Sequence, residues 1–227
     1  MNKIAFLIGA FLILITNLQA QEFEGKITFK LSYGGDAAAQ MQAMAPSGIV
    51  YQTRDGNTRF EMQGGMAAMM LGTFIVHAKD EAMYVLKDSE KKAYKMPLDG
   101  NQGTDTKPKV TKLKETLKIQ GYKCQKYKVE TTIQGQPMVQ HVWAAKDIKM
   151  IKPKAKGAAG NLYIEGVEGF PLKIEADSKI MGMSITTTTI ATEVDTKKPN
   201  KSNFEVPKGY TVEKTTMEAL GRGLLGG

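Results

Sequence analysis

The chain has 227 residues and a formal net charge of +8, from 31 Lys and Arg against 23 Asp and Glu. Its single cysteine excludes an internal disulfide, so the fold must be stabilised by a hydrophobic core. Aromatic residues make up only 7% of the chain and the lysines are spread along it. Nucleic-acid binding needs basic residues clustered on one face, often beside aromatic stacking platforms, so we expect no nucleic-acid partner.

The first 20 residues have the layout of a secretory signal peptide. Lys3 is followed by an apolar run over residues 4–15, and the segment closes on the small residue Ala20. The run is short for a membrane span, which needs about 20 residues. We predict cleavage after Ala20, no transmembrane segment in the remaining chain, and a periplasmic or secreted protein. An uncleaved N-terminal anchor is the alternative.

Most of the chain beyond this segment alternates apolar and polar residues with a period of two, which is typical of half-buried strands. Residues 26–33 place alternate apolar side chains on one face, namely Ile27, Phe29, Leu31 and Tyr33. Asp55-Gly56, between two extended runs, is a strong hairpin signal. Roughly ten such strands joined by short turns predict an antiparallel meander.

Two stretches interrupt the strand pattern and are rich in methionine. Residues 36–46 are helix-prone, and residues 62–71 bring further methionines together. Six of the 14 methionines lie between Met41 and Met70. Because methionine is flexible and polarisable, these stretches fit either an adaptable lid over an apolar cavity or ordinary core filling by helices packed on a sheet.

We predict the lining of an apolar cavity from these patterns. It combines the inward phase of the first strand with the second methionine stretch and the single tryptophan. The predicted lining residues are Phe29, Leu31, Tyr33, Met66, Met69, Met70 and Trp143. Copper(I) binding by thioethers is an alternative use of methionine, but Met62, Met66 and Met69 form no repeated motif, so we predict no metal.

Cys124 lies between Lys123 and Gln125 in a segment of alternating residues. A reactive thiol would need a lowered pKa and a base within reach. Free cysteine usually behaves instead as a small buried apolar residue. The alternation slips in phase around Gly121, which predicts a bulge. We predict that Cys124 is a buried strand residue.

Motifs of catalytic sites are missing from the sequence. The chain has two histidines and no H-E-x-x-H, G-x-S-x-G or P-loop pattern. Residues 221–226 match G-x-G-x-x-G, but a dinucleotide site needs a preceding strand and a following helix. We therefore predict no enzymatic activity and no cofactor.

The segment between Lys146 and Lys156 is strongly basic. It holds five lysines and one acid, Asp147. Such a run fits contact with an anionic surface, although a solvated face or loop is the simpler interpretation.

Four blocks in the second half of the chain resemble a known family of secreted Gram-negative proteins. In order they are ETLKIQGYKCQKYKVET, HVWAAKDI, GVEGFPLKIEA and FEVPKGY, and they span residues 115–210. The family is domain-of-unknown-function family 4412, which has no established activity and therefore implies no functional residues. In the first half, TRFEM and VHAKDEAMYVLKDSEKKAYKM resemble the broader lipoprotein-carrier superfamily of LolA and LolB.

The resemblance implies a mainly β fold with few short helices: a curved antiparallel sheet, or half-barrel, with helices plugging its concave side. In the carriers that cavity holds lipoprotein acyl chains. We expect a signal peptide over residues 1–20, a single domain over 21–212 and a flexible Gly-rich tail over 213–227. The expected function is non-catalytic binding of an apolar ligand, a lipid or lipoprotein acyl chain, in the cell envelope. The alternative is a structural or protein-interaction module with a filled core, whose partner is another envelope protein.

Overall fold

The computed structural model describes residues 22–98, 107–133, 135–150, 162–180, 182–216 and 219–220, without the side chains at positions 67, 70, 71, 133, 179 and 180. The predicted signal peptide lies outside these residues. Within them, no helix combines the length and the apolar character that crossing a membrane requires.

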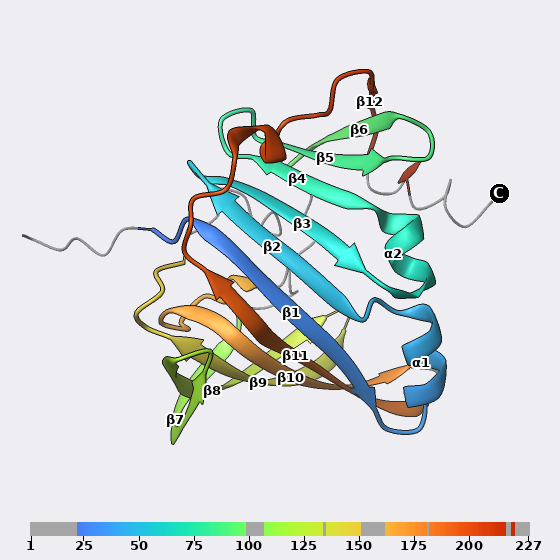
Figure 1. Cartoon of the computed structure of the whole chain (residues 1–227). Helices are drawn as coiled ribbons and strands as arrows, with labels where there is room; N and C mark the ends of the chain where they lie inside the picture. The colour runs from blue at the N-terminus through green and yellow to red at the C-terminus, as the bar shows by residue number, and fades with distance from the viewer. Residues whose placement is uncertain are drawn as a thin grey trace, which may run out of the picture.

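The described residues form one sheet of twelve strands and a few short helical turns (Figure 1). The strands are β1 (Gly25–Gly34), β2 (Gly48–Arg54), β3 (Asn57–Gln63), β4 (Thr73–His77), β5 (Ala82–Lys87), β6 (Lys92–Pro97), β7 (Lys109–Ile119), β8 (Tyr122–Ile133), β9 (Gln136–Ala145), β10 (Phe170–Ile180), β11 (Met183–Asp195) and β12 (Thr211–Lys214). The helical elements are α1 (Ala38–Met44), α2 (Gly65–Leu71) and the 3₁₀ turn η2 (Lys201–Phe204).

Their order across the sheet is β12-β6-β5-β4-β3-β2-β1-β11-β10-β9-β8-β7. Neighbouring strands pair antiparallel, except that β12 pairs parallel with β6. The strands β12 and β7 stand at the two ends of this order, so the sheet is open. The predicted mainly β fold with an antiparallel sheet is confirmed.

The turn between β2 and β3 follows the sequence prediction. Asp55 and Gly56 have φ angles of 51° and 76°, and Arg54 pairs directly with Asn57 across them. Positive φ at both central residues is the requirement of a type I′ turn, whose twist matches that of the flanking strands. The predicted Asp-Gly hairpin is confirmed.

The phase slip at Gly121 has a different cause from the bulge that we predicted. Gln120 and Gly121 have φ angles of 48° and 85° and form the two-residue turn of the β7–β8 hairpin, with Ile119 paired with Tyr122. The alternation changes there because the chain reverses, so the predicted bulge at Gly121 is wrong.

Register irregularities occur elsewhere and bend the sheet. One lies between Thr28 and Phe29, where β1 pairs with β11. Another lies between Lys112 and Thr116 of β7, and a third at the start of β10 where it pairs with β9. Bulges increase the local twist and bend the strand that carries them, which agrees with the strong curvature of the sheet (Figure 1).

Buried apolar side chains of the described residues gather in two clusters. The first, called here the central cluster, consists of Phe23, Ile27, Phe29, Tyr51, Ile119, Cys124, Trp143, Ala145, Ile148, Leu162, Phe170, Leu172 and Ala191. The second, called here the strap cluster, consists of Ile75, Ala82, Tyr84, Leu86, Ala93 and Phe204. Phe60 packs on the central cluster and pairs with Phe74; the adjacent Ile75 points to the other face. The two clusters therefore lie on opposite faces of β3 and β4.

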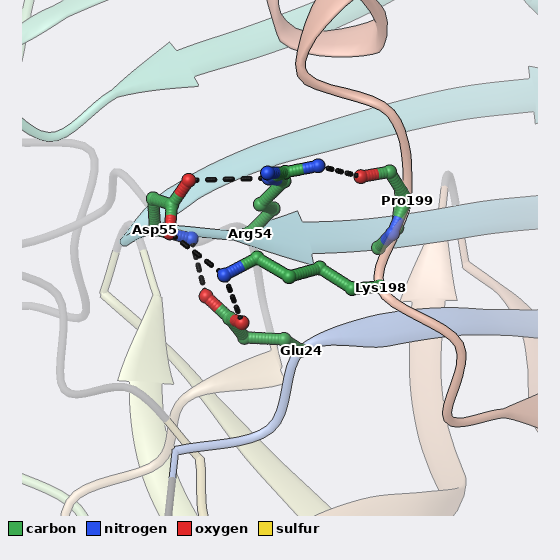
Figure 2. A network of polar contacts seen from close by, with 5 residues as sticks. All are labelled: Glu24, Arg54, Asp55, Lys198 and Pro199. Carbon is green, nitrogen blue, oxygen red and sulfur yellow. Dashed lines mark hydrogen bonds and ion pairs between the residues drawn. The ribbon is translucent and has the colours of Figure 1, made fainter.

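Residues 196–210, called here the strap, run from β11 over the face that carries the strap cluster and end at β12 (Figure 1). Lys198 Nζ lies 2.6 Å from a carboxylate oxygen of Glu24 and 2.9 Å from one of Asp55. Arg54 Nη1 donates a hydrogen bond of 2.6 Å to the Pro199 carbonyl. Figure 2 shows that these contacts tie the beginning of the strap to the start of β1 and the β2–β3 turn.

The second half of the strap is held by further contacts. Arg59 Nη1 donates to the Asn203 carbonyl at 3.1 Å, and the Tyr210 hydroxyl donates to Asp88 at 2.5 Å. The chain then forms β12 beside β6. Because β12 ends at Lys214, the sheet continues two residues beyond the boundary that the sequence suggested.

The helices α1 and α2 contact each other and lie together at one end of the sheet (Figure 1). Neither carries a charged residue, and α1 has no buried residue. The expectation that helices plug the concave side is therefore not shown by these two elements.

Candidate ligand pocket

A cavity of about 150 Å³ lies where the chain leaves β9 and returns to β10. Its walls come from residues 146–150 and 162–169 and from the start of β10. The lining residues are Lys146, Lys149, Met150, Leu162, Tyr163, Ile164, Val167, Gly169 and Pro171. Most of them are apolar, so the cavity offers an apolar wall with two lysines in it.

The sheet and the N-terminal segment hold this pocket in place. Pro171, one of its lining residues, pairs with Ala144 of β9. The Lys149 carbonyl accepts a hydrogen bond of 3.0 Å from the Phe23 backbone N–H, and Leu162 belongs to the central cluster. The wall residues are thus attached to the hydrophobic core at several points, which gives the pocket a fixed frame.

Gly169 is the position at which the pocket wall formed by residues 162–169 joins β10. Its φ angle is +96°, a conformation that other residues rarely adopt. A Cβ atom at this position would lie 2.2 Å from the Ala145 carbonyl oxygen. The backbone of residue 169 therefore passes too close to the end of β9 for a side chain at this position. The glycine is therefore required for the loop to close against β9.

The two lysines of the pocket differ in their partners. Lys146 Nζ lies 2.5 Å from Glu168 Oε2. This hydrogen bond and the charge of the partner raise the pKa of Lys146 and lower that of Glu168. Within the described part of the chain, the ammonium group of Lys149 has no ion-pair partner. Of the two lysines in the described pocket wall, Lys149 is therefore the one whose ammonium group is available to an anionic group.

The volume limits what the pocket can bind. A cavity of about 150 Å³ is the size of an engineered apolar cavity that binds benzene, and it is below the roughly 300–1,000 Å³ of sites for drug-sized ligands. The pocket can hold a small apolar group or the end of a chain, with an anionic group beside the lysines.

The first-strand residues predicted to line a cavity lie in or beside the core. Phe29 is only 2% exposed and belongs to the central cluster. Leu31 packs against the same cluster. The Tyr33 hydroxyl donates a hydrogen bond of 2.6 Å to the Pro46 carbonyl, and burial raises the pKa of Tyr33.

The predicted methionines lie at the end of the sheet. Met66 and Met69, on α2, are exposed to solvent. Met70 belongs to the same helix, but its side chain is outside the described part of the structure. In the sheet order, β2, β1 and β11 separate the strands that flank α2 from β10, where the pocket lies.

Trp143 is buried in the central cluster. Its cross-strand neighbours are Lys126 on β8 and Lys173 on β10. Their ammonium groups lie 5.0 and 4.4 Å from the ring centroid, within the range of cation–π attraction. Trp143 thus joins three strands of the sheet.

None of the six predicted lining residues with described side chains is in the wall of the 150 Å³ pocket. The structure brings Phe29 and Trp143 into one cluster, with Leu31 packed on it, and leaves Met66 and Met69 exposed. The predicted cavity lining stays a prediction.

The sequence contained one partial signal for the pocket. The basic segment that starts at Lys146 supplies Lys146, Lys149 and Met150 to the wall. Ile164 and Val167 come from a loop without the strand period, and Pro171 lies at the start of β10, so the strand pattern did not predict any of them as a lining residue.

Cys124 is confirmed as a buried strand residue. It lies in β8 and is fully buried as a free thiol. Burial raises the pKa of the Cys124 thiol to about 11, whereas a nucleophilic cysteine needs a lowered pKa. The thiol therefore stays protonated near neutral pH. Among the described residues, no group of three or more His, Cys, Asp and Glu side chains is placed to hold a metal ion.

A family model described as "Domain of unknown function (DUF4412)" matches residues 23–210. The chain belongs to the DUF4412 family. This confirms the family resemblance of the four sequence blocks. The match also covers the first half of the chain, which those blocks did not include, from residue 23 onwards. The pocket, the strap and both buried clusters lie within the matched residues.

Comparison with solved structures finds a crystal structure of a LolA superfamily protein from Nitrosomonas europaea. It is similar to this DUF4412 chain with a TM-score of 0.36 and 8% sequence identity, over 81% of this chain and 90% of that chain. No curated protein sequence matches the chain.

Proposed function

We propose that this protein is a non-catalytic component of the cell envelope that binds an apolar ligand, an acyl chain of a lipid or lipoprotein. The observation that carries the proposal is the pocket between β9 and β10, with its apolar wall and its two lysines. The signal-peptide pattern at the N-terminus supports an envelope location.

The chemistry of the pocket fits one end of an amphiphile. Met150, Leu162 and Ile164 remove methylene groups from water, which stabilises the bound state by about 0.8 kcal/mol for each CH₂. Lys149 attracts a carboxylate or phosphate at the edge of the apolar wall. A volume of about 150 Å³ admits part of one chain, so the remainder of the ligand would lie outside the pocket.

The proposal is tested with the purified protein from residue 21 onwards. Organic-solvent extraction and mass spectrometry report any co-purified lipid, and a fluorescent fatty acid reports uptake by the emptied protein. We expect a lipid in near-stoichiometric amount, or saturable uptake of the fluorescent acid.

Matched variants locate the ligand. Val167→Asp places a charge in the pocket wall, and Val212→Asp places the same charge at an exposed position on β12. We expect Val167→Asp to abolish uptake and Val212→Asp to leave it unchanged. Equal uptake by both variants would contradict a ligand site in this pocket.

The cavity predicted from the sequence is a rival site, and Met69 and Met70 belong to its predicted lining. A Met69→Asp, Met70→Asp double variant separates the two. If the double variant takes up the fluorescent acid normally and Val167→Asp does not, the ligand binds between β9 and β10. The opposite result places it at α2, as the sequence pattern suggested.

The second candidate function is a structural or protein-interaction module. The observation in its favour is the closed central cluster, in which Phe29 and Trp143 are buried against other side chains. An empty organic extract and no uptake of the fluorescent acid would favour this candidate.

A further inference from the structure

Three methionines stand out from the helices at the end of the sheet. Met44 on α1 is 50% exposed, and Met66 and Met69 on α2 are 58% and 86% exposed. Large apolar side chains are usually removed from water. Met96 on β6, at 1% exposed, is the buried counterpart within the same chain.

The fold holds these helices together as a pair. Gly65, the first residue of α2, has a φ angle of +69°, and a Cβ atom there would lie 2.1 Å from the Ala45 carbonyl oxygen. The end of α1 and the beginning of α2 therefore meet backbone to backbone. Asp36, just before α1, accepts hydrogen bonds from the Ser184 N–H and hydroxyl at 3.1 and 2.7 Å, which ties the pair to the beginning of β11.

Met44, Met66 and Met69 are each at least half exposed, and none of them belongs to the central cluster or the strap cluster. Neither helix contains a charged residue, and α1 has no buried residue. At these exposures we expect a polar group added to Met44, Met66 or Met69 to reach water without disturbing the buried clusters. The same change at Met96 would place a polar group in the packed interior, where an unpaired polar group is costly.

We propose that Met44, Met66 and Met69 form a methionine-oxidation site, at which a peroxide modifies the protein without unfolding it. In each reaction the thioether sulfur attacks one oxygen of hydrogen peroxide. The O–O bond breaks, an S–O bond forms, and proton transfer releases water. The sulfur is oxidised by two electrons to the sulfoxide, and the peroxide is reduced.

Oxidation changes the character of this surface. Methionine sulfoxide is polar and chiral where methionine is flexible and apolar, and sulfoxide reductases reverse the change. The α1–α2 surface thus has an apolar reduced state and a polar oxidised state on an unchanged sheet. The inference is independent of ligand binding in the pocket between β9 and β10.

The test exposes the purified protein from residue 21 onwards to a series of hydrogen peroxide concentrations and maps sulfoxides by peptide mass spectrometry. We expect Met69 to react first and Met44 and Met66 next, with Met69 more than about tenfold faster than the buried Met96. The far-UV circular dichroism and the thermal midpoint should not change when the three sites are oxidised. A methionine sulfoxide reductase pair should then restore the original mass.

A variant with Met44→Leu, Met66→Leu and Met69→Leu provides the matched control, because leucine has a similar size and cannot accept oxygen. It should fold normally and lack the fast phase of oxygen uptake. Equal oxidation rates at Met69 and Met96 would overturn the proposal. So would a fall in the thermal midpoint that parallels oxidation of the three residues, or sulfoxides that the reductases do not reduce.

Discussion

Phe204 is the point at which removal of one side chain should loosen the strap. It is 3% exposed and packs with Ile75, Tyr84 and the rest of the strap cluster, although it lies outside the sheet in sequence and topology. His77 Nε2 also contacts the Phe204 carbonyl. Phe204→Ala removes the ring and leaves the hydrogen bonds of the backbone in place.

The magnitude follows from burial. Complete burial of a phenylalanine side chain contributes about 1.5–3 kcal/mol, and a cavity term raises the measured cost of Phe→Ala to about 3–5 kcal/mol. Since the strap is a surface segment, it can partly collapse into the space, so we expect the lower part of this range. We therefore predict that Phe204→Ala lowers the free energy of unfolding by about 3 kcal/mol.

The assay is urea denaturation followed by tryptophan fluorescence, with Leu117→Ala as the control. Leu117 is 40% exposed on β7, and substitutions at such surface positions usually change stability by no more than about 0.5 kcal/mol. Limited proteolysis should also cleave within residues 196–210 sooner in Phe204→Ala. A loss below about 1 kcal/mol, close to ordinary surface effects, would refute the inference that this ring anchors the strap.

Three further predictions concern other parts of the fold. Gly169→Ala should destabilise the protein by about 1–3 kcal/mol, because φ is positive and the new Cβ atom would collide with a carbonyl oxygen of β9. Gly182→Ala, at a position with positive φ but open space for a Cβ atom, should lower the free energy of unfolding less in the same urea titration. The hydrogen bond from Lys198 is the largest cause that lowers the pKa of Glu24 below 4.5, so this pair stabilises the fold above pH 4.5 and the contribution is lost as the pH falls through the folded-state pKa. Lys198→Ala should therefore reduce the fall of the thermal midpoint at acidic pH, and an unchanged fall would contradict this assignment. Cys124 should react with a thiol reagent at pH 8 only as fast as the protein unfolds, because the thiol is buried and its pKa is about 11; rapid stoichiometric labelling of the folded protein would be inconsistent with this placement.

Local patterns in the sequence were sufficient for the strands. The period of two in residues 26–33 became β1, with Ile27 and Phe29 in the core, because side chains on a pleated strand alternate between its faces. The Asp55-Gly56 turn could also be predicted from local sequence, because a two-residue turn with positive φ at both positions depends on those two residues alone.

Features that depend on distant segments were not predictable. The strap cluster needs Phe204 to reach β4, β5 and β6, and no local pattern connects these segments. The pocket likewise forms only where residues 162–169 return to β9. At Gly121 the phase slip itself was visible, but a bulge and a hairpin turn change the alternation alike, and the pairing of Ile119 with Tyr122 decides between them.

The methionine-rich stretches show a different limit. The composition of residues 36–46 indicated a helix, and α1 does form there, while α2 forms in the second methionine stretch. Methionine packs equally well in a core, over a cavity or on an adaptable surface, so composition did not determine the exposure of Met66 and Met69.

The most direct test of the proposed function is to map where an acyl chain binds. A fatty acid with a photoreactive group at its chain end is bound to the purified protein, irradiated, and located by peptide mass spectrometry. We predict adducts at Met150, Ile164 and Val167, in the wall of the pocket between β9 and β10. Adducts at α1 and α2 alone, or labelling that an excess of unmodified fatty acid does not reduce, would contradict the proposal.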